Sequence, residues 1–349
     1  MIFSSKKIIG LDIGSSSIKL AEITVTNNNA VLDNFAFIQS PNQSMNNGEI
    51  IDSLLISESI KSAFKENAFS NKKACVGLSG TAVIVKKISI PKVESKNIAE
   101  QVQYEAAQYL PFDISQVTLD YHQLSFSQNA TSTDLLVVAA QNEFILSYLE
   151  TVSRAGLKCQ ILDVGSLALA NLFELNYGKT NEPVAIFNFG SNITNFLVLL
   201  QGEVIFSRDI PVGGFHFTNE ISKNMGVTFE EAESLKISQS NKQEVPEETR
   251  TFMNIALEHV TEEIRNSIDF YTATANGLLI SRAYFTGGAS LTVGLIDHLI
   301  ESVKLPFEVL NPYIKIKSGN KKLSASYLQQ ISPFVGISFG LGLRKSGDS

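Results

Sequence analysis

The alternation of apolar and polar residues predicts a pair of strands at the start of the chain. An apolar lead-in precedes a turn at 12–17 that contains glycine and serine, and the following stretch at 18–23 alternates apolar with other residues. A period of two is typical of a half-buried strand. The pattern therefore predicts two strands between Ile8 and Thr24, and a third strand at Ala30–Gln39.

A segment between about 83 and 140 has its own sequence of elements. Extended runs lead into a helix that is expected to be capped by Ser95 and to reach Leu110. Two strands follow, at Val117–Phe126 and Leu135–Ala140. A strand–helix–strand–strand module of this size is typical of an insertion into a larger domain.

The rest of the chain mixes helical and strand patterns, which indicates an α/β protein. The expected helices are Ile51–Phe64, Glu143–Ala155, Val164–Tyr177, Phe217–Ile237, Glu247–Ala273, one that ends at Val303, and Phe334–Leu343. The expected strands are Val184–Phe187, Ile193–Leu200, Val204–Arg208 and Ala283–Phe285.

The turn after the first strand recurs in the second half of the chain. In both places an apolar run leads to Asp12 or Asn188, and Gly14 or Gly190 follows two residues later, next to a serine. The two turns lie 188 − 12 = 176 residues apart, close to half of the 349 residues. Either turn alone would be read as a plain hairpin, but the pair indicates a duplicated domain.

Such turns are suited to holding phosphate. Glycine lets the backbone approach an anion closely, and successive backbone N–H groups form an anion-binding nest. The serine hydroxyls, at Ser15–Ser17 and Ser191, add donors. A carboxylate such as Asp12 repels phosphate but suits Mg²⁺ as an outer ligand. Lys19, on the strand beyond, can supply a positive charge.

Composition narrows the class of protein. Apolar residues make up 44% and charged residues 18%, so most of the chain is expected to fold rather than to be disordered. The net charge of −7 and the lack of a basic run argue against nucleic acid as a partner. Cys75 and Cys159 are far apart, which fits a reducing compartment. With no signal peptide and no membrane-length apolar run, we expect a cytoplasmic protein without direct membrane insertion.

With these motifs in view, the chain resembles the superfamily of actin, heat-shock chaperone and sugar-kinase ATPases. The resemblance implies an actin-like fold that binds ATP with Mg²⁺, and Asp12 is the implied metal ligand. It assigns nucleotide contacts in the first turn to Asp12, Gly14, Ser15, Ser16, Ser17 and Lys19, and in the second turn to Asn188, Gly190, Ser191 and Asn192. The glycine pair Gly213 and Gly214 is also assigned to the nucleotide. Glu233 and Lys236 are assigned to ribose and adenine, and Gly287, Gly288 and Ala289 are placed around adenosine.

Within that superfamily the chain is similar to the PilM family of type IV pilus assembly. The similarity rests on the inserted segment Ile98–Asp113, on Leu119–Tyr121 and on the ending Val335–Arg344. It implies a scaffold that docks the short cytoplasmic N-terminal peptide of a PilN-like inner-membrane protein, with self-association open. Such a protein would be peripheral to the inner membrane through its partner.

The resemblance also implies a division of the chain into two lobes. The first lobe is expected to comprise 1–178 and 326–349, with the inserted β-α-β-β subdomain at 84–150. The second lobe is expected to comprise 179–325. One residue departs from the family pattern: the second turn normally begins with Asp, and this chain has Asn188. Because an amide holds hydrated Mg²⁺ less strongly, we expect nucleotide to bind while hydrolysis is slow or absent.

Two other functions of the same superfamily remain open. An FtsA-like cell-division protein would form filaments and end in a basic amphipathic helix, and the polar ending at 344–349 argues against it. A small-molecule kinase would need a carboxylate base beside its substrate. Asp163 is the candidate, although a carboxylate at a helix N-terminus is the simpler interpretation.

Overall fold

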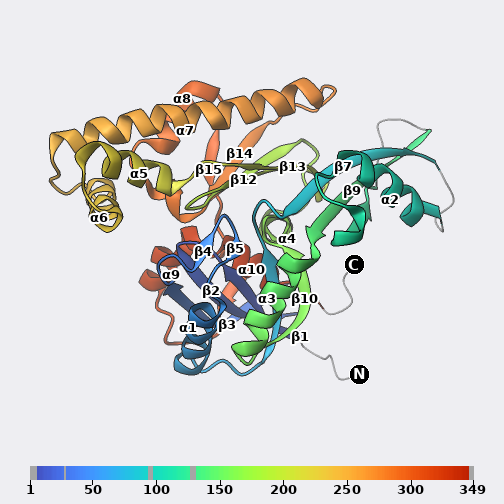
Figure 1. Ribbon diagram of the computed structural model, residues 1–349, viewed down its shortest axis with the longest axis horizontal. Helices are drawn as coiled ribbons and strands as arrows, with labels where there is room; N and C mark the ends of the chain where they lie inside the picture. Colours follow the sequence, from blue (N-terminus) through green and yellow to red (C-terminus); the bar gives the residue numbers. More distant parts are fainter. Residues whose placement is uncertain (1–5, 27–28, 93–96, 126–130, 346–349) are drawn as a thin grey trace.

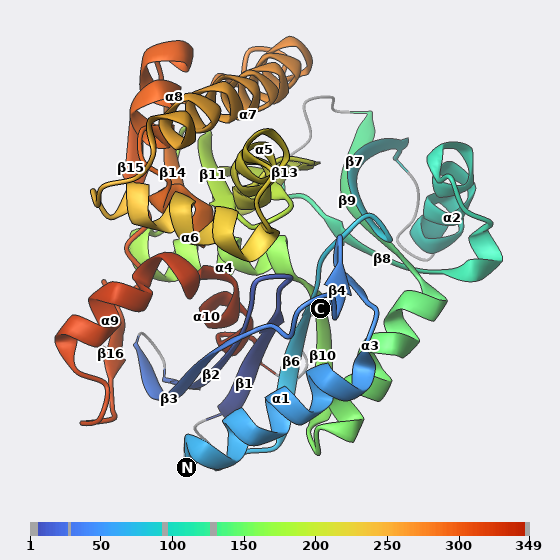
Figure 2. The same cartoon turned by 60° about the vertical axis from the view of Figure 1, so that its left-hand side comes forward.

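The computed structural model describes residues 6–26, 29–92, 97–125 and 131–345. Two large β-sheets lie on either side of a central pair of helices (Figure 1). A smaller three-stranded sheet projects to one side (Figure 2).

The first sheet has six strands in the order β10–β6–β1–β2–β3–β16. Its strands are β1 (Lys6–Ile13), β2 (Ser17–Val25), β3 (Ala30–Gln39), β6 (Lys73–Leu78), β10 (Lys158–Val164) and β16 (Ile316–Ser318). Strands β1, β2 and β3 form an antiparallel meander, and β6, β10 and β16 join it in parallel. Helices α1 (Ser53–Glu66) and α3 (Asn142–Arg154) pack on one face through a buried apolar cluster. The two-residue strands β4 (Met45–Asn46) and β5 (Glu49–Ile50) pair beside them.

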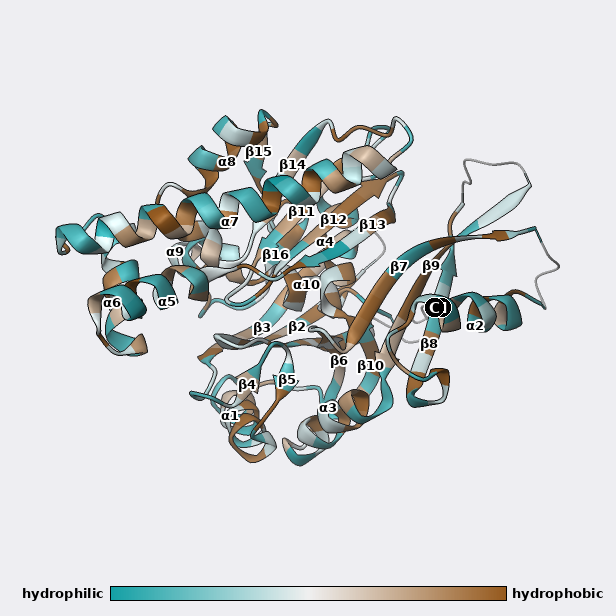
Figure 3. Cartoon of the chain, turned by 45° about the horizontal axis from the view of Figure 1, so that its top comes forward, coloured by the Kyte–Doolittle hydropathy of each residue, from teal (hydrophilic) through white to brown (hydrophobic). Residues whose placement is uncertain are grey.

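The second sheet has five strands in the order β13–β12–β11–β14–β15. Its strands are β11 (Val184–Phe189), β12 (Thr194–Leu200), β13 (Glu203–Ile210), β14 (Arg282–Thr286) and β15 (Phe307–Val309). The helices of this lobe are α5 (Gly214–Met225), α6 (Phe229–Ser240), α7 (Glu247–Thr274) and α8 (Leu295–Val303). Figure 3 shows hydrophobic and hydrophilic residues alternating along α7. Its buried residues recur every three or four positions, as at Val260, Ile264 and Ile268, so one stripe faces the sheet.

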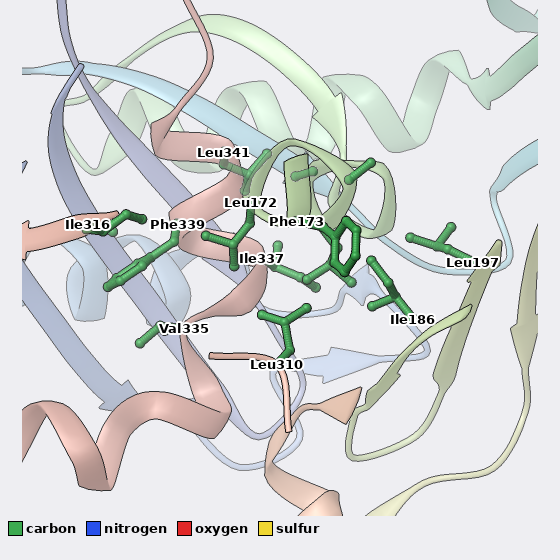
Figure 4. Close-up of a cluster of buried hydrophobic side chains, with 14 of the residues drawn as sticks. Leu172, Phe173, Ile186, Leu197, Leu310, Ile316, Val335, Ile337, Phe339 and Leu341 are labelled. Atoms are coloured by element: carbon green, nitrogen blue, oxygen red, sulfur yellow. The ribbon is translucent and has the colours of Figure 1, made fainter. Parts of the chain in front are cut away.

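Two helices are shared between the sheets. Helix α4 (Gly165–Tyr177) and the short helix α10 (Gly336–Gly342) contribute to one apolar core that also takes residues from both sheets (Figure 4). Ile23 comes from the first sheet, and Ile186 and Leu197 come from the second. All seven residues of α10 are buried. The two lobes are therefore joined through a common hydrophobic core.

Glycines permit this close packing of α10. A Cβ on Gly340 would lie 2.0 Å from the carbonyl oxygen of Ala168 in α4, and a Cβ on Gly10 would lie 1.9 Å from the carbonyl oxygen of Ser338. Neither clash involves a movable side-chain end. Helix α10 can therefore approach α4 and β1 only where these glycines stand.

The inserted module has strands β7 (Val83–Pro91), β8 (Val117–Gln123) and β9 (Ser132–Gln141), in the order β7–β9–β8. Helix α2 (Ile98–Tyr109) covers them through Ile98 and Val102, which pack against Ile90, Leu135 and Val137. The expected strand–helix–strand–strand order is present. Ser95, the expected cap of the helix, lies outside the described residues.

The predictions missed several elements. Strand β6 went unrecognised because it is buried on both faces and therefore lacks alternation. Strand β10, at the edge of the sheet, is partly exposed along most of its length and shows no alternation either. The short strands β15 and β16 and helix α9 (Ala325–Ile331) were also missed. Short elements of this kind carry too few residues to show a period.

Sheet membership differs from the expected lobe boundaries in two places. Helix α3, expected partly within an insertion that ends at 150, packs on the first sheet instead. Strand β16, expected in a second lobe that extends to 325, pairs with β3 of the first sheet. Both differences arise because strand pairing and helix packing join segments far apart in the chain.

We predict that Gly340→Ala lowers the free energy of unfolding by about 3 kcal/mol, because the added methyl group meets backbone atoms that cannot rotate away. Gly156→Ala is the control. Gly156 has a φ of +83° with open space around it, so only backbone strain of about 1 kcal/mol is expected. Urea denaturation of both variants measures the difference. Equal losses in the two variants would contradict the steric role of Gly340.

Candidate functional site

A cavity of about 500 Å³ lies between the two lobes, and most of the sequence-predicted residues line it. This volume is within the usual range for small-molecule sites. The predicted residues on its wall are Asp12, Gly14, Ser15, Ser16, Ser17, Lys19, Asn188, Gly190, Ser191, Asn192, Gly214, Glu233, Lys236, Gly287, Gly288 and Ala289. Gly213 is the exception. It lies just behind the second turn, where a Cβ would come within 2.6 Å of the Ser191 carbonyl oxygen.

The first turn places opposite charges side by side at the cavity. Asp12 on β1 is directly opposite Lys19 on β2. The Lys19 Nζ lies 3.2 Å from Asp12 Oδ2 and donates to the Ser17 carbonyl oxygen at 3.1 Å. Both charged side chains are 11% exposed, so little water screens the pair. The turn itself closes through the Gly14 N–H, which donates to the Ser17 carbonyl oxygen.

The second turn repeats the backbone of the first with different side chains. The Gly190 N–H donates to the Ile193 carbonyl oxygen, as Gly14 does to Ser17. Asn188 on β11 is opposite Asn195 on β12, and its Nδ2 donates to Asn195 Oδ1 at 2.8 Å. The two turns thus have the same construction, but the second lacks both charges of the first.

Each turn is held by the segment after its third strand. In the first lobe, the Ser40 Oγ donates to the Gly14 carbonyl oxygen at 2.6 Å. In the second lobe, the N–H groups of Gly214 and Phe215 donate to the carbonyl oxygens of Gly190 and Ser191. These bonds orient the turns without using the N–H groups of the serines.

Glu233 and Lys236, on α6, form a polar network on the cavity wall, in which Lys236 is buried and Glu233 is partly exposed. The Lys236 Nζ lies 2.7 Å from Glu233 Oε2 and also donates to the Gly214 carbonyl oxygen and to Thr218 Oγ1. The Thr218 hydroxyl in turn donates to Glu233. Burial lowers the pKa of Lys236, and the Glu233 carboxylate offsets only part of that effect. The pair therefore ties α6 to α5 beside the glycine pair.

The segment Gly287–Ala289 closes another side of the cavity. Gly287 has a φ of +94°, and a Cβ there would lie 2.4 Å from the Phe189 carbonyl oxygen. Gly288 begins the short 3₁₀ helix η3 (Gly288–Leu291), and its Cα faces the ring of Phe334. The absence of side chains lets this segment lie directly against the second turn.

Sequence reasoning missed several residues of the cavity wall. Apolar Ile237, Leu291 and Phe334 line it, as do the backbone segments at Gly48 and at Ser79 and Gly80. Ile237 and Leu291 are 49% and 53% exposed, so they offer apolar surface at the cavity. Only their exposure in the folded protein distinguishes them from core residues.

Asp163 stands away from this cavity. Its Oδ2 lies 3.4 Å from the Arg344 guanidinium, and its Oδ1 accepts from the Val164 N–H at 2.8 Å. Burial raises the pKa of Asp163, and Arg344 opposes that rise. The carboxylate therefore has a structural partner and does not line the cavity that the two turns form.

The residues of the site are better suited to a metal ion that is also coordinated by a ligand than to a metal ion held by protein side chains alone. Among the described residues, no group of three or more His, Cys, Asp and Glu side chains is placed to hold a metal ion. Magnesium is commonly bound through one or two carboxylates together with phosphates of the ligand. Asp12 supplies such a carboxylate on the cavity wall, next to a glycine turn suited to phosphate.

Comparison with known proteins decides the family. The family model described as type IV pilus assembly protein PilM matches residues 10–346. The chain belongs to the PilM family. A chain of the solved PilM–PilN type IV pilus biogenesis complex is 26% identical, with a TM-score of 0.86 over 97% of this chain and 98% of that chain.

More distant relatives share the fold. MreB5 of Spiroplasma citri, solved with bound AMPPNP, is 13% identical, with a TM-score of 0.50 over 93% of this chain and 98% of that chain. The cell division protein FtsA of Bacillus subtilis (strain 168) is 25% identical over 252 residues, or 65% of this chain. The match spans 57% of the length of FtsA. The actin-like fold expected from the sequence is confirmed.

The helices give no sign of a membrane span. In the part of the chain that the structure describes, none combines the length and the apolar character that crossing a bilayer requires.

We predict that Glu233→Gln lowers the free energy of unfolding by about 2 kcal/mol near neutral pH, because Lys236 keeps its charge but loses its counter-ion. A lysine whose pKa is lowered by folding stabilises the fold more as pH rises toward its ordinary 10.5. The loss should therefore shrink at about pH 9.5. Urea denaturation at the two pH values measures it.

Glu58→Gln is the matched control. Glu58 also pairs with a lysine three residues along its helix, Lys61, but both side chains are exposed. Its loss should be within about 0.5 kcal/mol at either pH. A pH-independent loss in Glu233→Gln would show that the counter-ion role is wrong.

Proposed function

We propose that this protein is an ATP-binding actin-like scaffold of type IV pilus assembly that docks the cytoplasmic N-terminal peptide of a PilN-like inner-membrane protein. The observation that carries the proposal is the cavity between the lobes, on which both duplicated turns converge. Two phosphate-type turns facing one cavity of this size suit a nucleoside triphosphate.

Two charged residues of the first hairpin would bind different parts of a magnesium nucleotide. Lys19 offers a cation to the phosphates, and Asp12 offers a carboxylate to hydrated Mg²⁺. In the structure these two groups neutralise each other at 3.2 Å. A bound magnesium nucleotide would replace that pairing with one opposite charge for each of them. The turn therefore stays electrically balanced in both states.

The base and the sugar would take the opposite side of the cavity. Gly214, Gly287, Gly288 and Ala289 leave room there, and Glu233 and Lys236 are the polar groups beside them. The exposed Ile237 and Leu291 offer apolar surface to the flat faces of an adenine ring. Support for ATP as the ligand also comes from the fold, since MreB5 of Spiroplasma citri was solved with AMPPNP.

We infer that hydrolysis is slow or absent. Asn188 occupies the place where the family pattern has a carboxylate, and it makes a neutral amide pair with Asn195. An amide oxygen holds hydrated Mg²⁺ and orients an attacking water less strongly than a carboxylate does. The protein would then use bound ATP to hold its two lobes together rather than hydrolyse it to drive movement.

The partner is inferred from the PilM–PilN complex, which is similar over almost the whole chain. Docking of a short peptide from an inner-membrane protein would place this protein at the cytoplasmic side of that membrane. FtsA-like self-assembly is the second candidate, because FtsA matches 65% of the chain. The family match at 10–346 favours the pilus role.

We predict that the protein binds ATP in the presence of Mg²⁺ and that Lys19→Met weakens binding about tenfold, because a charge-assisted contact to phosphate is lost. Lys61→Met, which removes a lysine from an exposed surface pair, should leave the affinity unchanged. Isothermal titration calorimetry measures both. In single turnover the unmodified chain should hydrolyse little of its bound ATP, and Asn188→Asp is the comparison. Rapid turnover by the unmodified chain would contradict the scaffold role.

We predict that the N-terminal peptide of a PilN-like protein co-purifies with this chain, whereas a scrambled peptide of the same composition does not. The experiment is repeated with Mg²⁺·ATP, with Mg²⁺ alone and with Lys19→Met, so that nucleotide dependence is measured directly. Sedimentation velocity of the same samples reports self-association. Concentration-dependent filaments without peptide capture would favour the FtsA-like alternative.

A further inference from the structure

Three polar side chains form a continuous chain across adjacent strands of the second sheet. Asn188, Asn195 and Asp209 stand opposite one another on β11, β12 and β13. The Asn188 Nδ2 donates to Asn195 Oδ1 at 2.8 Å, and the Asn195 Nδ2 donates to Asp209 Oδ1 at 2.7 Å. We call these three residues the amide relay. It begins on the wall of the interlobe cavity and ends at a carboxylate two strands away.

The first lobe has a different arrangement at the same places. There Asp12 stands opposite Lys19, and Lys19 stands opposite Phe37 on β3, so the carboxylate is on the first strand and the facing position of the third strand is uncharged. In the second lobe the carboxylate is on the third strand instead. The second turn has therefore not simply lost its charge, because a carboxylate reaches it through two amides.

The direction of the relay follows from the chemistry of its last member. The Asn195 NH₂ group faces Asp209, which is the direction required by an ionised carboxylate, because that group can only accept hydrogen bonds. The Asn195 oxygen then faces Asn188, which must turn its own NH₂ group toward Asn195. The polar atom of Asn188 that remains for a ligand is its Oδ1.

The surroundings of Asp209 are compatible with this direction. Burial is the larger influence and raises the pKa of the Asp209 carboxyl group, and the hydrogen bond from Asn195 offsets only part of that rise by favouring the ionised form. Arg208 is the other charged residue on the wall of the small cavity beside Asp209, and its guanidinium lies over the Phe270 ring. Asn195 itself is only 6% exposed, so water competes little for its amide.

We propose that Asp209 is a positioning residue that acts through Asn195 to present the Asn188 amide oxygen, rather than its NH₂ group, to the hydrated Mg²⁺ carried by a nucleotide in the cavity. The proposal rests on the proposed function. Oxygen is the ligand type that Mg²⁺ and its bound waters require, whereas an NH₂ group would face them with a like partial charge. The relay thus supplies the polarity of a carboxylate without its full charge.

Variants that reverse the direction of the two hydrogen bonds in the relay test the proposal. Asn188→Asp alone places carboxylates on both sides of Asn195, whose single NH₂ group can face only one of them. Asp209→Asn alone keeps the hydrogen bonds but allows both directions. In Asn188→Asp/Asp209→Asn, the amide at 209 donates to Asn195, which then donates to the carboxylate at 188. The double variant therefore locks the relay in the opposite direction.

Thermal unfolding without nucleotide measures the coupling between the two positions. Asn188→Asp should lower the melting temperature by roughly 3 °C, whereas Asp209→Asn and the double variant should stay within about 1 °C of the unmodified chain. Asp269→Asn, which removes an exposed carboxylate on α7 away from the helix N-terminus, is the control and should leave the melting temperature unchanged. If the melting-temperature shift of the double variant equals the sum of the shifts of the two single variants, the relay is wrong.

The dependence of ATP affinity on Mg²⁺ distinguishes positioning from a merely structural role. The factor by which Mg²⁺ tightens ATP binding should fall about twofold in Asp209→Asn, because about half of the molecules would hold the competent amide direction. It should rise about tenfold in the double variant, which presents a carboxylate. If this factor is unchanged in both variants while ATP still binds, the proposed role of Asp209 is wrong and the proposed function is unaffected. If the unmodified chain binds no ATP, the proposed function fails, and the role of Asp209 toward nucleotide fails with it.

Discussion

The close packing of α10 between the sheets is the contact on which the rest of the structure depends. A helix of seven residues, all buried, lies against α4 and β1 at backbone distance, and this is possible only because Gly10 and Gly340 carry no side chain. The resulting core takes residues from both sheets, so one hydrophobic core holds together the two lobes that form the walls of the interlobe cavity. A side chain at Gly10 would meet the Ser338 carbonyl oxygen at 1.9 Å, and one at Gly340 would meet the Ala168 carbonyl oxygen at 2.0 Å.

The two lobes use one backbone plan for different electrostatics. Both turns close through equivalent hydrogen bonds and both put a polar pair at the end of their hairpin. The first pair is a buried ion pair, Asp12 with Lys19, and the second is the neutral amide pair Asn188 with Asn195. Because charges are weakly screened where water is scarce, the place of the carboxylate differs in its effect on the two turns: it stands at the first turn itself and two strands away from the second.

Sequence patterns found most of the cavity wall because its residues lie in strongly constrained local motifs. Gly14, Gly190 and Gly287 stand in turns where the backbone approaches other backbone closely, and such glycines stand out in any sequence. The patterns failed at β6, whose burial on both faces removes alternation, and at β10, a partly exposed edge strand without alternation. They also failed at Ile237 and Leu291, because isoleucine and leucine are usually core residues.

The sequence by itself determined the duplicated hairpins, the inserted module and the family, because each is recognised from short motifs that are contiguous in the chain. Only the tertiary structure decided that β16 returns to the first sheet, that α3 packs outside the insertion, and that Asp209 lies two strands from Asn188. These relations depend on which strands pair and in which register. Pairing joins residues far apart in the chain, and its energy comes from burial and hydrogen bonds that no local pattern records.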